Sequence, residues 1–131
     1  MWVHRDRALR QAIFSPGRDL RDAIVGSLAM VRFRLVRRKV LEKHFTPDSA
    51  AIFGPFHELM HTLHPALFAV DGPDLTKVGL SILERRDDRV RARVRVKVAG
   101  RWVTSFPGYT LRRGAGAWQV DLREMRPARP T

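Results

Sequence analysis

The clearest hydrophobic pattern in the chain is a strict alternation from Val90 to Val98, in which small or β-branched residues alternate with cations. A period of two is typical of a strand with one buried face and one solvated face. The solvated face would carry four cations about 6.6 Å apart, namely Arg91, Arg93, Arg95 and Lys97. Because like charges repel, this cation row needs acidic neighbours on adjacent strands or an anion from outside the protein.

The period of two recurs on both sides of this strand and predicts an antiparallel meander of four strands. Apolar residues alternate over residues 78–82 and again over residues 118–122. Pro107-Gly108 interrupts the third strand, which begins at Trp102. Proline cannot donate to a β-ladder, so this dipeptide indicates a bulge or an edge position. Turns are predicted at residues 86–88, 99–101 and 114–116.

The first half of the chain has helical periodicity, and it predicts helices over residues 4–14, 19–44, 47–53 and 55–70. Asp19 can cap the long helix, and Thr46 can cap the next one with Pro47 at its first position. The long helix has an apolar stripe with a spacing of three and four residues, formed by Leu20, Ile24, Leu28, Val31 and Leu35. Helices followed by a meander predict an α+β fold, with the helices packed on one face of a curved sheet.

The length of 131 residues fits one domain with a sizeable core. We expect a basic N-terminal extension over residues 1–18, a single α+β domain over residues 19–124 and a frayed basic tail over residues 125–131. The longest apolar run, Ala23 to Val31, is too short to cross a bilayer, and the N-terminus has no signal-peptide pattern. We therefore expect the protein to be cytoplasmic or peripheral to a membrane.

Charge is the strongest compositional signal. The chain has 25 Lys and Arg against 13 Asp and Glu, a net charge of +12, which favours nucleic acid, anionic lipid or an acidic protein as partner. A second cationic cluster, at the end of the long helix, consists of Arg37, Arg38, Lys39 and Lys43. Cations also suit the negative end of the helix dipole, so a solvated helix end explains this cluster too. The absence of cysteine excludes disulfides and thiolate chemistry.

Three short segments carry a resemblance to a known family: Phe45-Thr46-Pro47-Asp48, Val94-Arg95-Val96 and Gly116-Ala117-Trp118-Gln119-Val120-Asp121. Over residues 19–124 the chain resembles the NTF2-like and cystatin-like superfamily, and within it the Tim44-type subgroup. The resemblance implies a cone-shaped α+β domain with a pocket between sheet and helices. Some members of this group isomerise or cyclise small molecules, and many only bind or assemble. The fold alone therefore does not decide between an enzymatic and a binding function. Many such domains have a strand between the helices, and we expect none within residues 19–70.

The segment His57-Glu58-Leu59-Met60-His61 fits the H-E-x-x-H pattern. Two imidazoles four residues apart on a helix can hold one zinc ion, and Glu58 would then act as general base on a zinc-bound water. This pattern predicts a small zinc-dependent hydrolase, for which His64 and Glu84 are the candidates for a third ligand. Alternatively, the histidines flank the apolar face of an amphipathic helix and bind nothing.

A second enzymatic hypothesis places His61 in the pocket that the resemblance implies. A histidine titrates near neutral pH and can serve as an acid or base. Its companion would be Asp121 or Glu84, and the reaction would be that of a small-molecule isomerase, cyclase or lyase.

The patterns together favour a non-enzymatic NTF2-like module for binding or assembly. Its cation row would dock on an anionic partner such as RNA, an anionic membrane surface, an acidic protein or a protein complex. The second cationic cluster would act in the same way. No cofactor is expected unless the histidines bind zinc. A homodimer through the sheet face is a further alternative, which the cations would oppose unless acidic residues of the second copy met them.

Aromatic residues accompany the cations and could supply stacking platforms for single-stranded nucleic acid. They are Trp2, Trp102, Phe106, Tyr109 and Trp118. Trp118 is in register with Val120, which predicts a place in the core. By parity Trp102 should line the same apolar side as Phe106, and Tyr109 is the aromatic with the weakest prediction of burial.

Overall fold

The structure of the chain, a computed structural model, describes residues 4–14, 19–34, 37–69, 72–114 and 116–124. The helical half consists of α1 (His4–Phe14), α2 (Leu20–Phe33), α3 (Arg38–His44), α4 (Pro47–Ala51), α5 (Phe53–Leu63) and the short 3-10 helix η1 (Pro65–Leu67). The second half consists of β1 (Val78–Arg85), β2 (Arg89–Val98), β3 (Arg101–Arg113), β4 (Trp118–Val120) and the 3-10 helix η2 (Leu122–Glu124). The predicted α+β class is confirmed.

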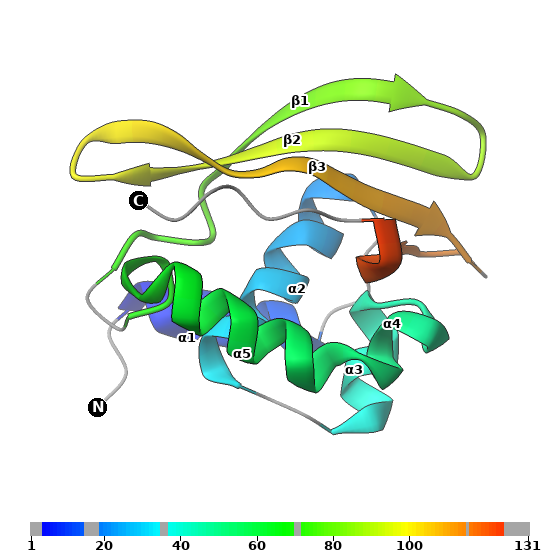
Figure 1. The fold of residues 1–131 in the computed structure, drawn as a ribbon, viewed down its shortest axis with the longest axis horizontal. Coiled ribbons are helices and arrows are strands. Elements are labelled where there is room, and N and C mark those ends of the chain that lie inside the picture. Colours follow the sequence, from blue (N-terminus) through cyan, green and yellow to red (C-terminus); the bar gives the residue numbers. More distant parts are fainter. Residues whose placement is uncertain (1–3, 15–18, 35–36, 70–71, 115, 125–131) are drawn as a thin grey trace.

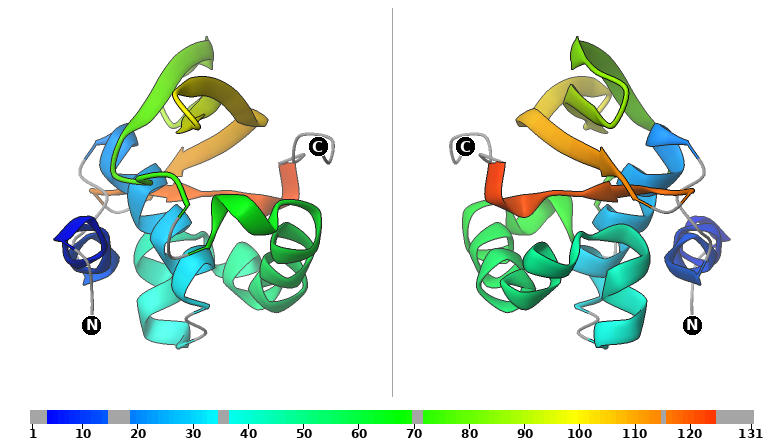
Figure 2. Two further views of the ribbon diagram at one scale, coloured as in Figure 1. Left: turned by 90° about the vertical axis from the view of Figure 1, so that its left-hand side faces the viewer. Right: turned by 90° about the vertical axis from the view of Figure 1, so that its right-hand side faces the viewer.

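The four strands form one antiparallel sheet in the order β1-β2-β3-β4, which is the predicted meander. The sheet forms one layer and the helices form the other, with α2 running up to the sheet (Figure 1). The side views in Figure 2 show the strands twisted and curved above the helical layer. The helices that the structure describes therefore lie on one side of the sheet, and none of them covers the opposite sheet face.

The predicted single helix over residues 19–44 is wrong, because it ends at Phe33. Asp19 caps α2 as predicted, since its Oδ1 accepts a hydrogen bond of 2.8 Å from the backbone N–H of Asp22. Arg34 adopts a left-handed conformation with φ of 55°, which ends the helix. Glycine usually occupies such a position, so an arginine there leaves no signal in the sequence.

Packing of α3 explains the break. His44 is fully buried, and its Nε2 lies 2.7 Å from the carbonyl oxygen of Ile13 in α1. Its ring also lies against Gly26 of α2, where a Cβ atom would be only 2.3 Å from His44 Cε1. A straight helix through residue 44 would carry these residues far from one another. The break therefore allows α3 to fold back onto α1 and α2.

The predicted helices over residues 47–53 and 55–70 are only partly confirmed. The N-cap of α4 is as expected, since Thr46 Oγ1 accepts a hydrogen bond of 3.3 Å from the backbone N–H of Ser49. However, α5 already begins at Phe53 and ends at Leu63. Pro65 disfavours helical geometry at His64, where the chain changes direction into η1. Val70, the expected end of the helix, lies outside the described residues.

Residues 1–18 do not form an extension outside the domain, at least where they are described. Leu9 and Ile13 of α1 are buried and belong to the same hydrophobic core as α2. The apolar spacing of four residues places both side chains on one face of the helix. The expected boundary at residue 19 therefore does not hold. The expected frayed tail over residues 125–131 lies outside the described residues.

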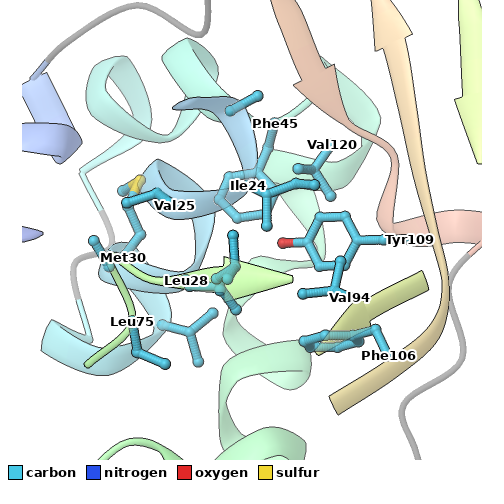
Figure 3. Packing of buried hydrophobic residues seen from close by; sticks show 14 of the residues in the cluster. Ile24, Val25, Leu28, Met30, Phe45, Leu75, Val94, Phe106, Tyr109 and Val120 are labelled. Atoms are coloured by element: carbon cyan, nitrogen blue, oxygen red, sulfur yellow. The ribbon is translucent and has the colours of Figure 1, made fainter. Parts of the chain in front are cut away.

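The core lies between α2 and the inner face of the sheet, as Figure 3 shows. Tyr109 is almost fully buried there, although it had the weakest prediction of burial, and its hydroxyl forms a hydrogen bond with Ser27 Oγ. Burial raises the pKa of the Tyr109 hydroxyl well above its ordinary value. Trp118 and Val120 are buried as predicted. The sequence therefore identified the inner face of β4 correctly.

A bulge or an edge position was predicted at Pro107-Gly108, and the structure has a bulge there, which explains the burial of Tyr109. Ala92 pairs with Tyr109 while Val94 pairs with Phe106, so two residues of β3 oppose Arg93 alone. One extra residue reverses the alternation of faces. Phe106 and Tyr109, three positions apart, therefore both point into the core, where their rings meet edge to face at a centroid distance of 4.9 Å.

One β-bridge links the helical half to the sheet. Phe45 pairs in parallel with Val120, and the backbone N–H of Thr46 donates to the carbonyl oxygen of Val120 at 3.0 Å. No strand was expected within residues 19–70, and the described residues of this range contain only this single-residue bridge. It anchors the chain between α3 and α4 to the edge of the sheet.

The buried His44 makes stability sensitive to acid. Desolvation by burial lowers the pKa of His44 below about 6.5, the value of a free histidine. Below that pH the unfolded chain binds more protons than the folded chain, so stability falls as pH falls. We expect the melting temperature to decrease between about pH 7 and about pH 5, and to decrease less in His44→Gln. Equal slopes in thermal melts of the two proteins would contradict this assignment.

Candidate anion-binding surface

The cation row lies on the outer face of β2, the face without helices, as the alternation predicts. Val90, Ala92, Val94 and Val96 are buried on the inner face. Arg91, Arg93 and Lys97 are exposed, and Arg95 is half-buried. The sheet itself therefore separates these cations from the helices and from the core beneath it.

Charges on the outer face are neutralised at one end of the sheet, near η2 at the right of Figure 1. Glu124 of η2 accepts from Arg89 of β2 at 2.7 Å and from Arg112 of β3 at 2.9 Å. Arg89 also lies 3.3 Å from Glu84 of β1. Asp121 binds Arg112 Nε at 2.6 Å. Glu84 also forms a salt bridge of 3.1 Å with Arg86, so three carboxylates neutralise three arginines at this end.

The pKa values follow from this network. Hydrogen bonding to Glu124 raises the pKa of Arg89, and hydrogen bonding to Asp121 raises that of Arg112. In return, the hydrogen bond from Arg89 lowers the pKa of Glu124. All these shifts favour the charged forms. Nothing in the sequence pattern identified Arg89 and Arg112 as the partners of these carboxylates.

The cation row itself receives no such compensation. Within the ranges that the structure describes, no carboxylate lies within salt-bridge distance of its four members. Arg95 donates to Ser81 Oγ at 3.3 Å, and its buried Nε has no hydrogen-bond partner. The guanidinium of Arg91 lies over Gly108, 2.9 Å from the position that a Cβ atom would occupy. Glu84 is the cross-strand neighbour of Arg91, but its ion pairs go to Arg86 and Arg89. The row therefore has no ion-pair partner of its own among the described residues, on an exposed sheet face.

Trp102 lies on this same outer face. The alternation that Trp102 shares with Phe106 had predicted the inner face instead. Val94 pairs with Phe106 but Arg95 pairs with Thr104, so Ser105 is a second extra residue in β3. This shift reverses the faces of all residues before it. Trp102 consequently pairs with Lys97 and is 51% exposed. Residues 103–105 contain no proline or glycine, so the sequence gives no sign of this second bulge.

A groove of about 720 Å³ opens beside Trp102, at the β2–β3 hairpin end of the sheet. One wall comes from the hairpin and includes Lys97, Gly100 and Trp102. The opposite wall comes from the segment before β1 and includes Asp74 and Lys77. Its volume is in the range of small-molecule sites. The groove thus adjoins the Lys97 end of the cation row and has a mostly uncharged lining.

The second cationic cluster lies on α3 and is partly neutralised. Arg38 forms a salt bridge of 3.0 Å with Glu42, and Lys43 donates to the carbonyl oxygen of Phe14 at 3.2 Å. Arg37 and Lys39 are exposed. These cations lie in the helical layer, whereas the cation row lies on the far face of the sheet. The two clusters therefore do not form one continuous surface.

The structure does not assemble the histidines into a metal site. The rings of His57 and His61 lie 6.1 Å apart and nearly perpendicular. His57 Nε2 lies 3.2 Å from Glu58 Oε1, and His61 Nε2 lies 2.7 Å from the carbonyl oxygen of Val31. A zinc site needs nitrogens that converge on one point. Among the described residues, no group of three or more His, Asp or Glu side chains could hold a metal ion.

His61 and Asp121 also have separate surroundings. His61 contacts Val31 and the ring of Phe68, at a centroid distance of 5.3 Å. Asp121 binds Arg112 and accepts from the backbone N–H of Arg123 at 3.1 Å. Each group is thus occupied by its own structural contacts. Glu84, the other candidate companion, lies on the sheet with Arg89.

Two searches bear on the role of the chain, one for membrane-spanning helices and one for related proteins. Over the described residues, no helix combines the length and the apolar character needed to cross a membrane. Comparison with protein-family models, with curated proteins and with solved structures finds no match to this chain.

Proposed function

We propose that this protein is a non-enzymatic binding module whose cation row docks on an anionic partner. The observation that carries the proposal is the uneven distribution of carboxylate side chains on the outer face of the sheet, where they gather at one end. Glu84, Asp121 and Glu124 neutralise Arg89 and Arg112, while the neighbouring cation row has no carboxylate partner among the described residues. Unpaired like charges in one row repel, and an external anion relieves that repulsion.

We further propose that the domain is NTF2-like. Helices that precede a curved four-stranded meander and cover one of its faces support this assignment. In a domain of this shape the open sheet face is a natural docking surface, because it has no helix to cover it. The proposed module therefore binds on the outside of the sheet and not in a pocket beneath it.

The test is the binding of inorganic polyphosphate at increasing salt, measured by calorimetry. We expect affinity to fall steeply with salt, because each phosphate contact releases a counterion. The variant Arg91→Glu/Arg93→Glu should bind at least about tenfold more weakly, with a salt slope reduced by about one per cation removed. Both side chains are exposed, so the variant should fold normally.

The matched control is Arg37→Glu/Lys39→Glu, which changes the net charge equally but lies on α3. This variant should bind polyphosphate almost as well as the unmodified protein. Equal losses in both variants would show that net charge alone attracts the anion, and would refute a docking site on β2. A salt-independent affinity would refute the proposal altogether.

A further inference from the structure

Trp102 has an unusual position for so large an aromatic side chain. It is half exposed on the same sheet face as the cation row. Its Cζ3 atom reaches to 3.5 Å from the position of a Cβ atom on Gly79, in β1. Because β2 lies between β3 and β1, the indole must cross β2 and lie along the sheet surface. Trp102 therefore lies across the sheet surface beside the cation row, with about half of its surface exposed.

Neighbouring cations hold this ring in place. Arg95 Nε also lies 3.5 Å from the Cβ position of Gly79, so the guanidinium and the indole meet above this glycine. Lys97 Nζ lies 5.9 Å from the ring centroid, within the range of a cation–π contact. The absence of a side chain on Gly79 provides the space for both groups. The platform thus exists before any partner binds.

We infer that the anionic partner is a single-stranded nucleic acid, with a base stacked on Trp102 and phosphates along the cation row. This inference rests on the proposed function and specifies its partner. An aromatic platform next to a row of cations is the combination that single-stranded nucleic acids use, because every base has a π-face and every nucleotide a charge. Successive cations of the row lie about 6.6 Å apart, a spacing similar to that of phosphates in an extended strand.

The groove beside Trp102 strengthens this choice of partner. It offers space of about 720 Å³ for a base or sugar next to Trp102, and its walls contain two cations, Lys77 and Lys97, and one acid, Asp74. A duplex would keep its bases stacked inside and could not use the platform. A membrane would favour an aromatic side chain that projects into the interface, whereas this ring lies along the sheet. An acidic protein supplies carboxylates for the cations, but it has no regular series of π-faces beside its charges as a nucleic acid strand has.

The experiment compares two labelled strands of about 12 nucleotides, an oligothymidylate and an abasic strand of equal length, by fluorescence anisotropy. The two strands carry the same phosphates and differ only in their bases. Trp102→Ala should weaken oligothymidylate binding by about 5- to 150-fold and leave abasic-strand binding within about twofold. Trp102→Phe should retain most of the affinity. Leu59→Ala, which removes an exposed apolar side chain from α5, is the control without effect.

The results separate this inference from the proposed function. Equal affinity of unmodified protein and Trp102→Ala for the oligothymidylate would overturn the stacking inference. So would a loss that is the same for both strands, or a Trp102-dependent binding of anionic lipid vesicles without binding of the oligothymidylate. In each case Arg91→Glu/Arg93→Glu would still weaken polyphosphate binding if the docking surface is correct. If that variant binds polyphosphate normally, the docking surface itself is refuted.

Discussion

Replacing Gly26 with alanine should lower the free energy of unfolding by about 1–5 kcal/mol. The new Cβ atom would lie 2.3–2.8 Å from three atoms of the His44 ring. The ring has no free direction to move, because it is fully buried and held by the carbonyl oxygen of Ile13. Overpacking costs about 1–3 kcal/mol, and a displaced ring would leave buried polar groups unpaired at a similar cost.

Helix propensity alone predicts the opposite sign, since alanine stabilises a helix interior by about 1 kcal/mol relative to glycine. Gly54→Ala is the matched control, because Gly54 is also helical and a Cβ atom there would meet nothing within 4 Å. Urea denaturation should show a loss for Gly26→Ala and none for Gly54→Ala. In a His44→Ala background the cost of Gly26→Ala should largely disappear. If Gly26→Ala were as stable as the unmodified protein, the close packing of α2 and α3 would be refuted.

Replacing Phe45 with alanine should cost about 3–5 kcal/mol, the usual range for a buried phenylalanine. Phe45 is fully buried, and its ring packs edge to face on Phe53 at a centroid distance of 5.2 Å. Its backbone also forms the bridge to Val120. The side chain thus joins α3, α5 and the sheet edge, so a cavity there weakens contacts between both layers.

Phe14→Ala is the control for Phe45→Ala, because the same side chain is 54% exposed at the end of α1. We expect it to change the free energy of unfolding by less than about 0.5 kcal/mol. Urea denaturation of both variants, with midpoint and slope compared, would test the difference. Similar losses in the two proteins would contradict the central position of Phe45.

Much of the sheet was predictable because its information is local. The alternation over residues 90–98 determines which side chains share a face, whatever the partner strands are. The irregularity at Pro107-Gly108 was predictable for the same reason, because proline has no backbone N–H to donate to a β-ladder. The caps at Asp19 and Thr46 depend on residues three positions away and were correct as well.

The helical half was predicted less well, because where its helices end and how they pack depend on contacts between residues far apart in the sequence. The apolar stripe continues past Phe33 to Leu35 and therefore favours a longer helix. The chain ends α2 at Arg34 because α3 gains contacts with Ile13 and Gly26, which are remote in sequence. The same holds for α1, whose periodicity predicted a helix but not its place in the core.

The sequence by itself determined that this protein has a row of four cations on one face of a strand, opposite a buried apolar face. That result follows from the twofold repeat of a β-strand, a property of a few consecutive residues. Only the tertiary structure decided that Glu84, Asp121 and Glu124 neutralise other arginines and leave this row unpaired. Only the tertiary structure also placed Trp102 beside the row, because the extra residue at Ser105 can be recognised only from the pairing of β2 with β3.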